Sequence, residues 1–314
     1  MASKSIPIYS VIAPIHNEEG VLPELYQRVR AVLDEYTENW ELLLIDDGSS
    51  DRSAIVIGQL HRSDPRVKGI KLARNFGFQI AVTAGLEHVQ GDAVILMDGD
   101  LQDPPEVIKD MIAQWKKGFD VVYGVRASRA GETWFKKATA HTFYRLIHRI
   151  TNVNIPVDTG DFRLMDRRVV TALLQMPERH RFLRGMVSWV GYRQTGVNYA
   201  RQPRFAGASK FTFGKMIQFA LEAITSFSYF PLQLASYLGF VMAGISGLSI
   251  VAVILLRLFG SAAPLLGQAT TLVSVLFLGS IQLICLGIIG EYLGRIYDEV
   301  KQRPLYLVDQ TWGV

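Results

Sequence analysis

The stretch Ala93-Val-Ile-Leu-Met-Asp-Gly-Asp-Leu-Gln-Asp-Pro-Pro-Glu106 determines how the rest of the chain is interpreted. It opens with a short apolar run that is typical of a buried strand, and its two prolines indicate the start of a helix. Asp98 and Asp100 follow the strand directly, at the edge where open α/β sheets bind their ligands. Two carboxylates there supply half of an oxygen-rich site for Mg²⁺ or Mn²⁺, which complete their shells with water and substrate phosphates. The stretch therefore predicts a metal-dependent enzyme acting on a nucleotide diphosphate; the simpler alternative is a solvated acidic turn.

Strand and helix patterns alternate through the first 125 residues. Such alternation predicts a mostly parallel sheet that is covered by helices on both faces. No Gly-x-Gly-x-x-Gly follows the first strand and no P-loop motif occurs, which disfavours a dinucleotide-binding fold and a P-loop enzyme. The expected strands are 8–13, 40–46, 67–72, 93–97 and 120–125, and the expected helices are about 20–36, 50–62, 76–88 and 105–117.

Two uncharged runs, 223–256 and 258–290, follow the sheet region and are separated by Arg257 alone. Each exceeds the roughly 20 residues needed to cross a bilayer, so the cores 231–256 and 270–293 are predicted to be transmembrane helices rather than a buried hairpin. Lys and Arg flank their outer ends, which predicts that both termini are cytoplasmic. We expect a cytoplasmic catalytic domain over 1–222, a two-helix membrane domain over 231–293 and a cytoplasmic tail over 294–314. The tail either packs on a neighbouring subunit or folds back on its own domain.

The charge distribution is strongly asymmetric. Residues 1–125 carry a net charge of −7, whereas residues 126–215 carry +12. The basic block adjoins the first apolar run, so anionic headgroups or an anionic lipid substrate are favoured partners over nucleic acid. Two segments in or next to it, about 134–150 and 211–226, are predicted to be amphipathic interfacial helices, with helices of the soluble core as the alternative. No N-terminal signal peptide is expected, and the single cysteine, Cys285, excludes an intrachain disulfide.

Polar loops follow the first three predicted strands: Pro14-Ile-His-Asn-Glu-Glu19, Asp46-Asp-Gly-Ser-Ser-Asp51 and Lys71-Leu-Ala-Arg-Asn-Phe-Gly-Phe78. Each could be a turn or a helix cap, but their succession at one sheet edge indicates a nucleotide site. Together with the 97–106 motif they resemble the inverting glycosyltransferases of family 2, which have the GT-A (Rossmann-like) fold. With two C-terminal spans, the whole chain resembles the polyprenyl-phosphate glycosyltransferases, particularly the GtrB-type glucosyltransferases and relatives of dolichol-phosphate mannose synthase.

This resemblance implies roles for individual residues. The nucleoside of the donor would be bound by Pro14, Asn17, Glu19 and Asp46, with Asp98 also contacting the donor. Asp98, Asp100 and Gln102 would position a divalent cation, Mg²⁺ or Mn²⁺, on its diphosphate. His16 stands where many relatives have Tyr, and we assign it no catalytic role.

The segment Val157-Asp-Thr-Gly-Asp-Phe-Arg-Leu-Met-Asp-Arg-Arg168 resembles the reacting centre of this class. Asp158 and Asp161 are both candidates for the catalytic carboxylate. Relatives acting on dolichol phosphate often carry Ser at the position of Asp161, which counts against a requirement for that carboxylate. A turn with a helix N-cap is the alternative interpretation. A phosphate-monoester acceptor has a second pKa of about 6 and needs no strong base. The carboxylate would instead orient the acceptor, bind metal or stabilise positive charge at the anomeric carbon.

The acceptor phosphate requires cations, because it must approach an anionic donor. The segment Arg201-Gln-Pro-Arg-Phe-Ala-Gly-Ala-Ser-Lys210 resembles the phosphate-binding loop of the family, and Arg offers a bidentate fork for phosphate. The predicted phosphate-binding residues are Arg126, Arg129, Lys136, Lys137, Arg201, Arg204, Ser209 and Lys210.

The resemblance thus implies an inner-membrane enzyme that transfers a hexose, with glucose from UDP-glucose favoured, to undecaprenyl phosphate, giving a β-linked lipid phosphosugar and UDP. A separate flippase and a downstream transferase would handle the product, and a homo-oligomer is possible. A processive polysaccharide synthase is an alternative, disfavoured by the absence of Gln-x-x-Arg-Trp. A non-catalytic scaffold that senses nucleotide sugars is a third, disfavoured by retention of the acidic motifs.

Overall fold

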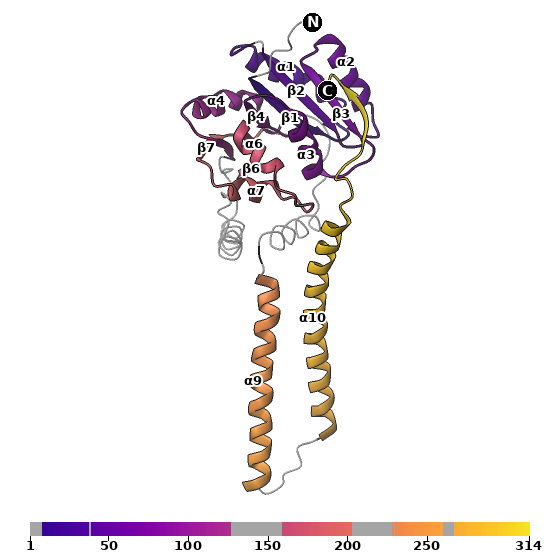
Figure 1. Ribbon diagram of the computed structural model, residues 1–314, viewed down its shortest axis with the longest axis vertical. Coiled ribbons are helices and arrows are strands. Elements are labelled where there is room, and N and C mark those ends of the chain that lie inside the picture. Colours follow the sequence, from indigo (N-terminus) through magenta and orange to yellow (C-terminus); the bar gives the residue numbers. More distant parts are fainter. Residues whose placement is uncertain (1–7, 38, 127–158, 203–227, 229, 260–266) are drawn as a thin grey trace.

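The computed structural model describes residues 8–37, 39–126, 159–202, 228, 230–259 and 267–314 (Figure 1). Several residues that were predicted to form the site lie outside these ranges, as do both predicted amphipathic helices, about 134–150 and 211–226. The site residues concerned are Arg129, Lys136, Lys137, Asp158, Arg204, Ser209 and Lys210.

Eight strands of the described residues form one sheet, in the order β7-β5-β6-β4-β1-β2-β3-β8. The neighbours β4-β1-β2-β3 are parallel, whereas β6 runs antiparallel to both β4 and β5, and β8 runs antiparallel to β3. The predicted mostly parallel sheet is therefore confirmed. The bounds are β1 Tyr9–Ile15, β2 Trp40–Asp46, β3 Val67–Leu72, β4 Ala93–Leu96, β5 Val121–Arg126, β6 Thr159–Asp166, β7 Gln194–Tyr199 and β8 Val308–Trp312.

Helices cover both faces of the sheet because its central strands are apolar on both faces. Leu42 and Leu44 of β2 belong to the core on one side, with α1 and α4, whereas Leu43 and Ile45 belong to the core on the other, with α3, α6 and α7. This alternation follows from the two-residue period of a strand. The helices are α1 Leu22–Leu33, α2 Ser53–Ser63, α3 Phe78–His88, α4 Ile108–Lys116, α6 Arg167–Leu174 and α7 Leu183–Trp189, with a 3₁₀ turn η1 Pro105–Val107 before α4.

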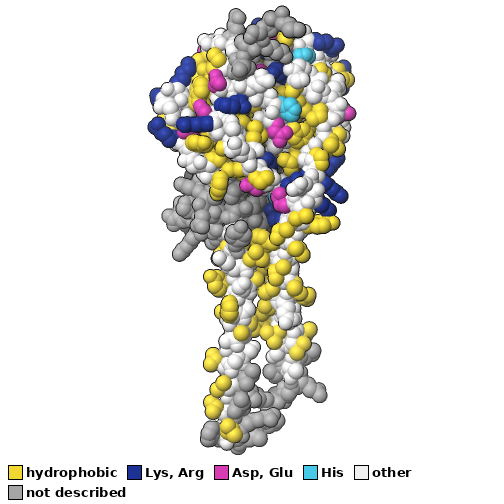
Figure 2. Space-filling view, viewed as in Figure 1, with side chains coloured by type: hydrophobic (Ala, Val, Ile, Leu, Met, Phe, Trp, Pro, Cys, Tyr) yellow, Lys and Arg dark blue, Asp and Glu magenta, His cyan; other side chains and the backbone are white. Residues whose placement is uncertain are grey.

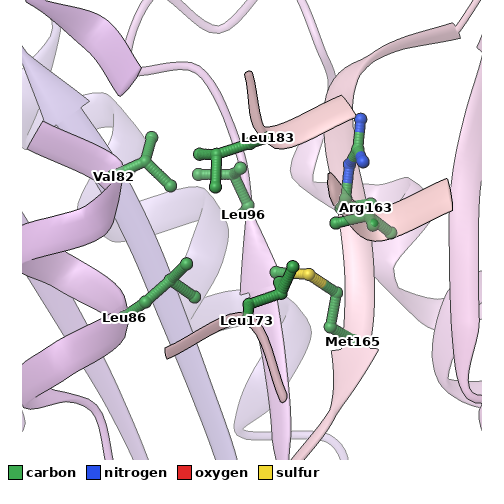
Figure 3. A pocket seen from close by; sticks show the side chains of 8 residues that line it. Val82, Leu86, Leu96, Arg163, Met165, Leu173 and Leu183 are labelled. Carbon is green, nitrogen blue, oxygen red and sulfur yellow. The ribbon is translucent and has the colours of Figure 1, made fainter. Parts of the chain in front are cut away.

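The second of these cores ends next to a buried arginine (Figure 3). Val82 and Leu86 of α3, Leu96 of β4 and Met165 of β6 line a small apolar space, with Arg163 at its border. The guanidinium of Arg163 donates to the backbone oxygens of Gly160 at 2.9 Å and Asp161 at 3.2 Å. Arg163 therefore supports the start of β6, where the candidate site residue Asp161 lies.

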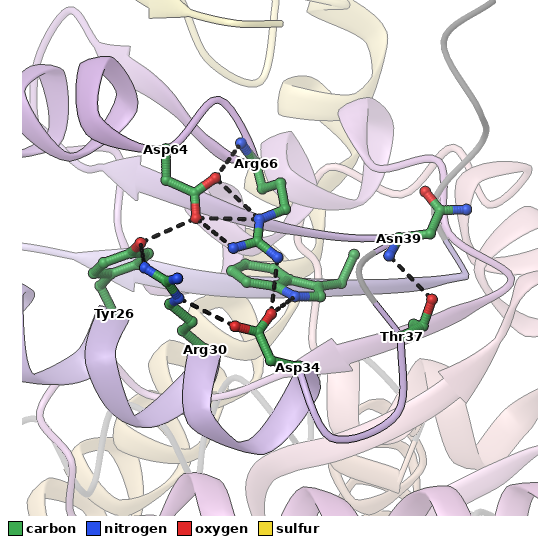
Figure 4. Close-up of polar contacts among 8 residues, drawn as sticks. Tyr26, Arg30, Asp34, Thr37, Asn39, Asp64 and Arg66 are labelled. Atoms are coloured by element: carbon green, nitrogen blue, oxygen red, sulfur yellow. Dashed lines mark hydrogen bonds and ion pairs between the residues drawn. The ribbon is translucent and has the colours of Figure 1, made fainter.

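A polar network stabilises the opposite, amino-terminal edge of the sheet (Figure 4). Arg66 donates to Asp64 at 2.8 Å and to Asp34 at 2.8 Å, and its guanidinium lies 4.1 Å from the centre of the Trp40 ring. Trp40 also donates to Asp34, and the hydroxyl of Tyr26 donates to Asp64. The network joins α1 to the starts of β2 and β3, away from the polar loops.

Two long helices, α9 Phe230–Phe259 and α10 Gly267–Lys301, extend away from the sheet (Figure 1). They are candidate membrane spans by length and composition over Phe230–Ser249 and Val273–Lys301. Figure 2 shows hydrophobic side chains along both helices. The second helix continues beyond the predicted core 270–293 to Lys301.

The C-terminal tail folds back on its own domain, which decides between the two alternatives left open by the sequence. β8 pairs with β3, and the Trp312 ring packs over Gly58 and Gly69, where an added Cβ would lie 3.0 Å and 2.7 Å from it. The backbone N–H of Ala73 also donates to the carbonyl of Leu307 at 2.9 Å. β8 and the residue before it therefore contact the start of the polar loop that follows β3.

Candidate active site

The predicted site residues converge where β1, β2 and β4 end and where β6 begins. Because β6 is antiparallel to β4, with Leu96 opposite Arg163, residues just before Arg163 lie beside residues just after Leu96. Asp161 is therefore brought to Asp98, although more than 60 positions separate them in the chain. The sheet thus unites the acidic loop with the segment predicted to form the reacting centre.

The loop after β1 holds the loop after β2. Asn17, with a left-handed φ of 55°, accepts at Oδ1 from the backbone N–H of Ser50 at 2.8 Å and of Asp51 at 3.3 Å. Glu19 accepts from the backbone N–H of Arg52 at 2.8 Å. Asn17 and Glu19 were predicted to bind the nucleoside. In the structure they hold the backbone of the loop that follows β2. Direct contact with the nucleoside stays a prediction for them and for Pro14.

The paired aspartates after β2 have different environments. Asp47 accepts from the backbone N–H groups of Phe76 at 2.7 Å and Gly77 at 3.0 Å, which joins this loop to the one after β3. Burial nevertheless raises the pKa of Asp47 above its usual range. Asp46 is fully buried and accepts from Ser49 at 2.8 Å through Oδ1, whereas its Oδ2 has no hydrogen-bond partner among the residues that the structure describes. A buried unpaired acceptor is costly, so Asp46 Oδ2 is suited to an N–H of a ligand.

The acidic loop approaches β1 closely at Gly99. A Cβ there would lie 2.5 Å from Cδ1 of Ile15 and 2.9 Å from the carbonyl oxygen of Pro14, so only glycine fits. Leu101 adopts a left-handed φ of 59°, and the backbone N–H of Gln102 donates to Asp100 Oδ1 at 3.1 Å. This tight turn holds the carboxylates at the sheet edge.

Negative charge accumulates around Asp98. Burial raises the pKa of Asp98 to about 7, and repulsion from Asp103, Asp161 and Asp100 adds to the effect. A divalent cation would offset this repulsion, and the oxygens of Asp98, Asp100 and the Gln102 amide are the ligand types that Mg²⁺ and Mn²⁺ accept. Within the described ranges, no group of three or more His, Cys, Asp or Glu is arranged to hold a metal. A cation held by Asp98, Asp100 and Gln102 would take its remaining ligands from phosphate and water.

Asp161 is held by an arginine that sequence reasoning missed. Arg184 of α7 donates to its two oxygens at 2.9 Å and 2.6 Å, and Arg163 lies 3.9 Å away. Burial acts to raise the pKa of Asp161, but the arginines outweigh it and hold that pKa below its usual range. Asp161 is thus an ionised carboxylate in a fixed orientation. The other candidate, Asp158, lies outside the described residues.

Two predicted phosphate-binding arginines reach the same site. Arg126, at the end of β5, lies over Gly160, where an added Cβ would be 2.6 Å from its guanidinium. Arg201 follows β7. Both lie beside Asp103, a residue of the acidic motif for which no role was predicted from the sequence. The sequence feature that could have pointed to Asp103 is its place in the acidic motif. For Arg184 that feature is its position in the basic block.

This sheet, with a nucleotide-type loop, an Asp-x-Asp turn and an opposing cationic half at one edge, has the arrangement of a GT-A glycosyltransferase. Residues 10–174 match the model for "Glycosyl transferase family 2", and the chain belongs to that family. The family resemblance read from the motifs is therefore confirmed.

Similar proteins cover nearly the whole chain. It is 49% identical to the uncharacterized glycosyltransferase YkcC of Bacillus subtilis (strain 168), over 98% of this chain and 94% of that protein. It is 44% identical to the bactoprenol glucosyl transferase of Shigella phage SfII, over 96% of this chain and 97% of that protein. Glucosyl-3-phosphoglycerate synthase from Mycobacterium tuberculosis, solved with Mn²⁺, UDP and glucosyl-3-phosphoglycerate, aligns with a TM-score of 0.48 at 16% identity, over 70% of this chain and 78% of that one.

Proposed function

We propose that this protein transfers a hexose from a nucleotide sugar to polyprenyl phosphate, with UDP-glucose as donor and undecaprenyl phosphate as acceptor. The observation that carries the proposal is the meeting of Asp98 and Asp100 with Asp161 and Arg126 at one sheet edge, in a chain with two candidate membrane spans. The 44% identity to a bactoprenol glucosyl transferase supports both the glucose and the lipid acceptor.

The donor half would bind the nucleotide. Asp46 Oδ2, buried and without a partner among the described residues, would accept an N–H of the nucleobase. Asp98, Asp100 and Gln102 would hold Mg²⁺ or Mn²⁺, which would supply positive charge to stabilise the departing nucleoside diphosphate. The loop contacts of Asn17 and Glu19 would keep the nucleoside pocket in shape.

The acceptor half would bring a second anion to the sugar. A phosphate monoester is largely dianionic at neutral pH, since its second pKa is about 6, so its oxygen can attack without a strong base. Arg126 and Arg201 would hold that phosphate, together with the predicted cations and Ser209 outside the described residues. Asp161, ionised and fixed by Arg184, would stabilise the positive charge that develops at the anomeric carbon.

The reaction would be a single in-line displacement. An acceptor-phosphate oxygen forms a bond to the anomeric carbon while the bond from that carbon to the β-phosphate oxygen of UDP breaks, and the electron pair leaves with UDP. An α-linked donor would thus give a β-linked lipid phosphosugar.

The proposed location is the inner membrane, with residues 1–222 and both termini in the cytoplasm. The apolar cores 231–256 and 270–293 would cross the bilayer, and the Lys and Arg residues beyond their outer ends support this orientation. Two spans offer no path for a sugar headgroup, so a separate flippase and a downstream transferase would handle the product.

The test uses the full-length protein in detergent with short-chain polyprenyl phosphate, Mg²⁺ or Mn²⁺, and labelled UDP- and GDP-sugars. An organic-extractable, acid-labile product from one donor would support the proposal and name the sugar. Label in long polymer would favour a processive synthase. Donor binding without transfer would favour a nucleotide-sugar-sensing scaffold.

A further inference from the structure

Asp103 is a fully buried carboxylate in the middle of the candidate acceptor half. Its Oδ1 accepts from the hydroxyl of Tyr199 and lies 3.7 Å from Nε of Arg201, and its Oδ2 lies 3.9 Å from a guanidinium nitrogen of Arg126. Neither Asp103 Oδ2 nor Arg201 Nε has a hydrogen-bond partner in the described part of the chain. Asp103 therefore contacts both described arginines that are predicted to bind the acceptor phosphate.

These contacts bring two separate segments to the acidic loop. Arg126 ends β5, Tyr199 ends β7, and Arg201 lies in the segment that follows β7. The same segment is attached to the loop a second time, because the backbone N–H of Gln202 donates to the carbonyl of Gln102 at 2.9 Å. The donor-side loop and the acceptor-side cations are thus joined at Asp103.

The charge balance at this point favours a fixed geometry. A buried carboxylate is stable only when it is hydrogen-bonded and paired with cations. Burial and the neighbouring Asp103 raise the pKa of Tyr199, so its hydroxyl stays a donor. Burial lowers the pKa of Arg126, but Tyr199 and Asp103 outweigh this, so the guanidinium stays charged.

The two arginines remain available for a ligand. The side chains of Arg126 and Arg201 are 30% and 27% exposed, whereas Asp103 is 0% exposed. Each arginine therefore contacts the buried carboxylate and keeps part of its side chain accessible. A long side chain that is already ordered loses less entropy when it binds phosphate.

We propose that Asp103 is a positioning residue that holds Arg126 and Arg201 in the geometry that binds the acceptor phosphate. This inference rests on the proposed function, since it assumes a phosphate-bearing acceptor. The alternative is that Asp103 weakens acceptor binding, because it competes with the acceptor phosphate for the two arginines. Removing its charge would then tighten acceptor binding instead of weakening it, so the direction of the change distinguishes the two.

The experiment compares full-length wild type with Asp103→Asn and with Asp110→Asn, which makes the same change at an exposed carboxylate of α4. The kcat and the KM for short-chain polyprenyl phosphate are measured, with UDP affinity in the presence of Mn²⁺ and the thermal midpoint. For Asp103→Asn we expect a KM about 10-fold or more higher, the size of one charge-assisted interaction. UDP affinity should stay within about twofold, and Asp110→Asn should behave as wild type.

Tyr199→Phe provides a second variant that removes one hydroxyl and keeps the ring packed edge-on against Phe162, with centroids 5.8 Å apart. We expect a smaller rise in the same KM. If Asp103→Asn does not fold, an unchanged KM in Tyr199→Phe overturns the inference. A lower KM, an unchanged KM or a loss of UDP binding in folded Asp103→Asn overturns it as well.

Binding of the short-chain polyprenyl phosphate to donor-free protein is measured in parallel. If the wild type transfers no sugar but binds this lipid phosphate, and Asp103→Asn binds it more weakly, the proposed function is contradicted while the role of Asp103 is supported. A wild type that does not bind this lipid phosphate contradicts both.

Discussion

Replacing Arg184 by Met tests whether Asp161 acts at the reacting centre. Arg184 makes two hydrogen bonds to Asp161, at 2.9 Å and 2.6 Å. The exposed fractions of the two side chains are 22% and 11%, so the pair is largely removed from water. Met keeps the apolar stem of the arginine but removes both hydrogen bonds, so Asp161 keeps the ion pair with Arg163 at 3.9 Å and the more distant charge of Arg126.

The cost can be estimated from this geometry. Removing one partner of a fully buried ion pair costs about 3–5 kcal/mol. Because Arg184 is partly exposed and Arg163 remains close, we expect a loss of about 2–3 kcal/mol in the free energy of unfolding. This corresponds to a thermal midpoint about 4–10 °C lower. Loss of the fixed carboxylate should reduce kcat about 100-fold, or about 2.7 kcal/mol of transition-state stabilisation.

The assay measures kcat for lipid phosphosugar formation and the affinity for UDP in the presence of Mn²⁺. UDP affinity should be unchanged, because the two hydrogen bonds that the Arg184 guanidinium donates go to Asp161. Arg184→Lys is the matched control: it keeps the charge but not the planar fork, so its kcat should fall between wild type and Arg184→Met. A folded Arg184→Met protein with kcat within about twofold of wild type would refute the reasoning.

Three further predictions concern other parts of the molecule. Asp100→Ala should abolish metal-dependent turnover while the thermal midpoint stays close to wild type; near-normal turnover at low Mg²⁺ would exclude its role as a metal ligand. Trp312→Ala should lower the free energy of unfolding by about 2 kcal/mol, because the ring packs over Gly58 and Gly69; an unchanged denaturation midpoint would show that β8 adds no stability. At the opposite edge, burial acts to raise the pKa of Asp64, but bonds from Arg66 outweigh it and lower that pKa in the folded state. The resulting stability is present above the unfolded pKa of about 3.9 and is lost as the pH falls through the lower folded value. The stability difference between wild type and Arg66→Met should therefore shrink on acidification from pH 7 to 3, and a constant difference would contradict this.

Local sequence was sufficient for the first half of the sheet. The strands over Trp40–Asp46 and Val67–Leu72 begin and end where the apolar runs predicted, because central parallel strands are apolar on both faces and end at turn residues. The acidic loop was likewise expected at a strand end, and Gly99 explains why it can approach β1 so closely.

β6, β7 and β8 were not predicted from the sequence, because their signals are not local. β6 contains Asp161, Arg163 and Asp166, and these charges conceal a strand whose polar groups find partners only in the folded chain, as Asp161 does in Arg184. β8 is short and polar, and it depends on the free edge of β3. The importance of Asp103 was hidden for the same reason, since its partners follow it by more than 20 residues.

The return of the chain from α10 links the candidate membrane segment to both halves of the site. Near the end of α10, Glu299 accepts from the backbone N–H of Arg179 at 2.8 Å, in the segment just before α7 and its Arg184. A few residues later, Leu307 accepts from Ala73 at 2.9 Å, at the start of the loop that Asp47 joins to the nucleotide side. One continuous segment therefore contacts the supports of the acceptor-side carboxylate and of the donor-side loop. An acceptor phosphate carried by a lipid would be confined to the membrane surface, so an enzyme acting on it must fix its site relative to the spans. If α9 and α10 cross the bilayer as proposed, the contact of α10 with Arg179 and the pairing of β8 with β3 would provide that connection with few residues.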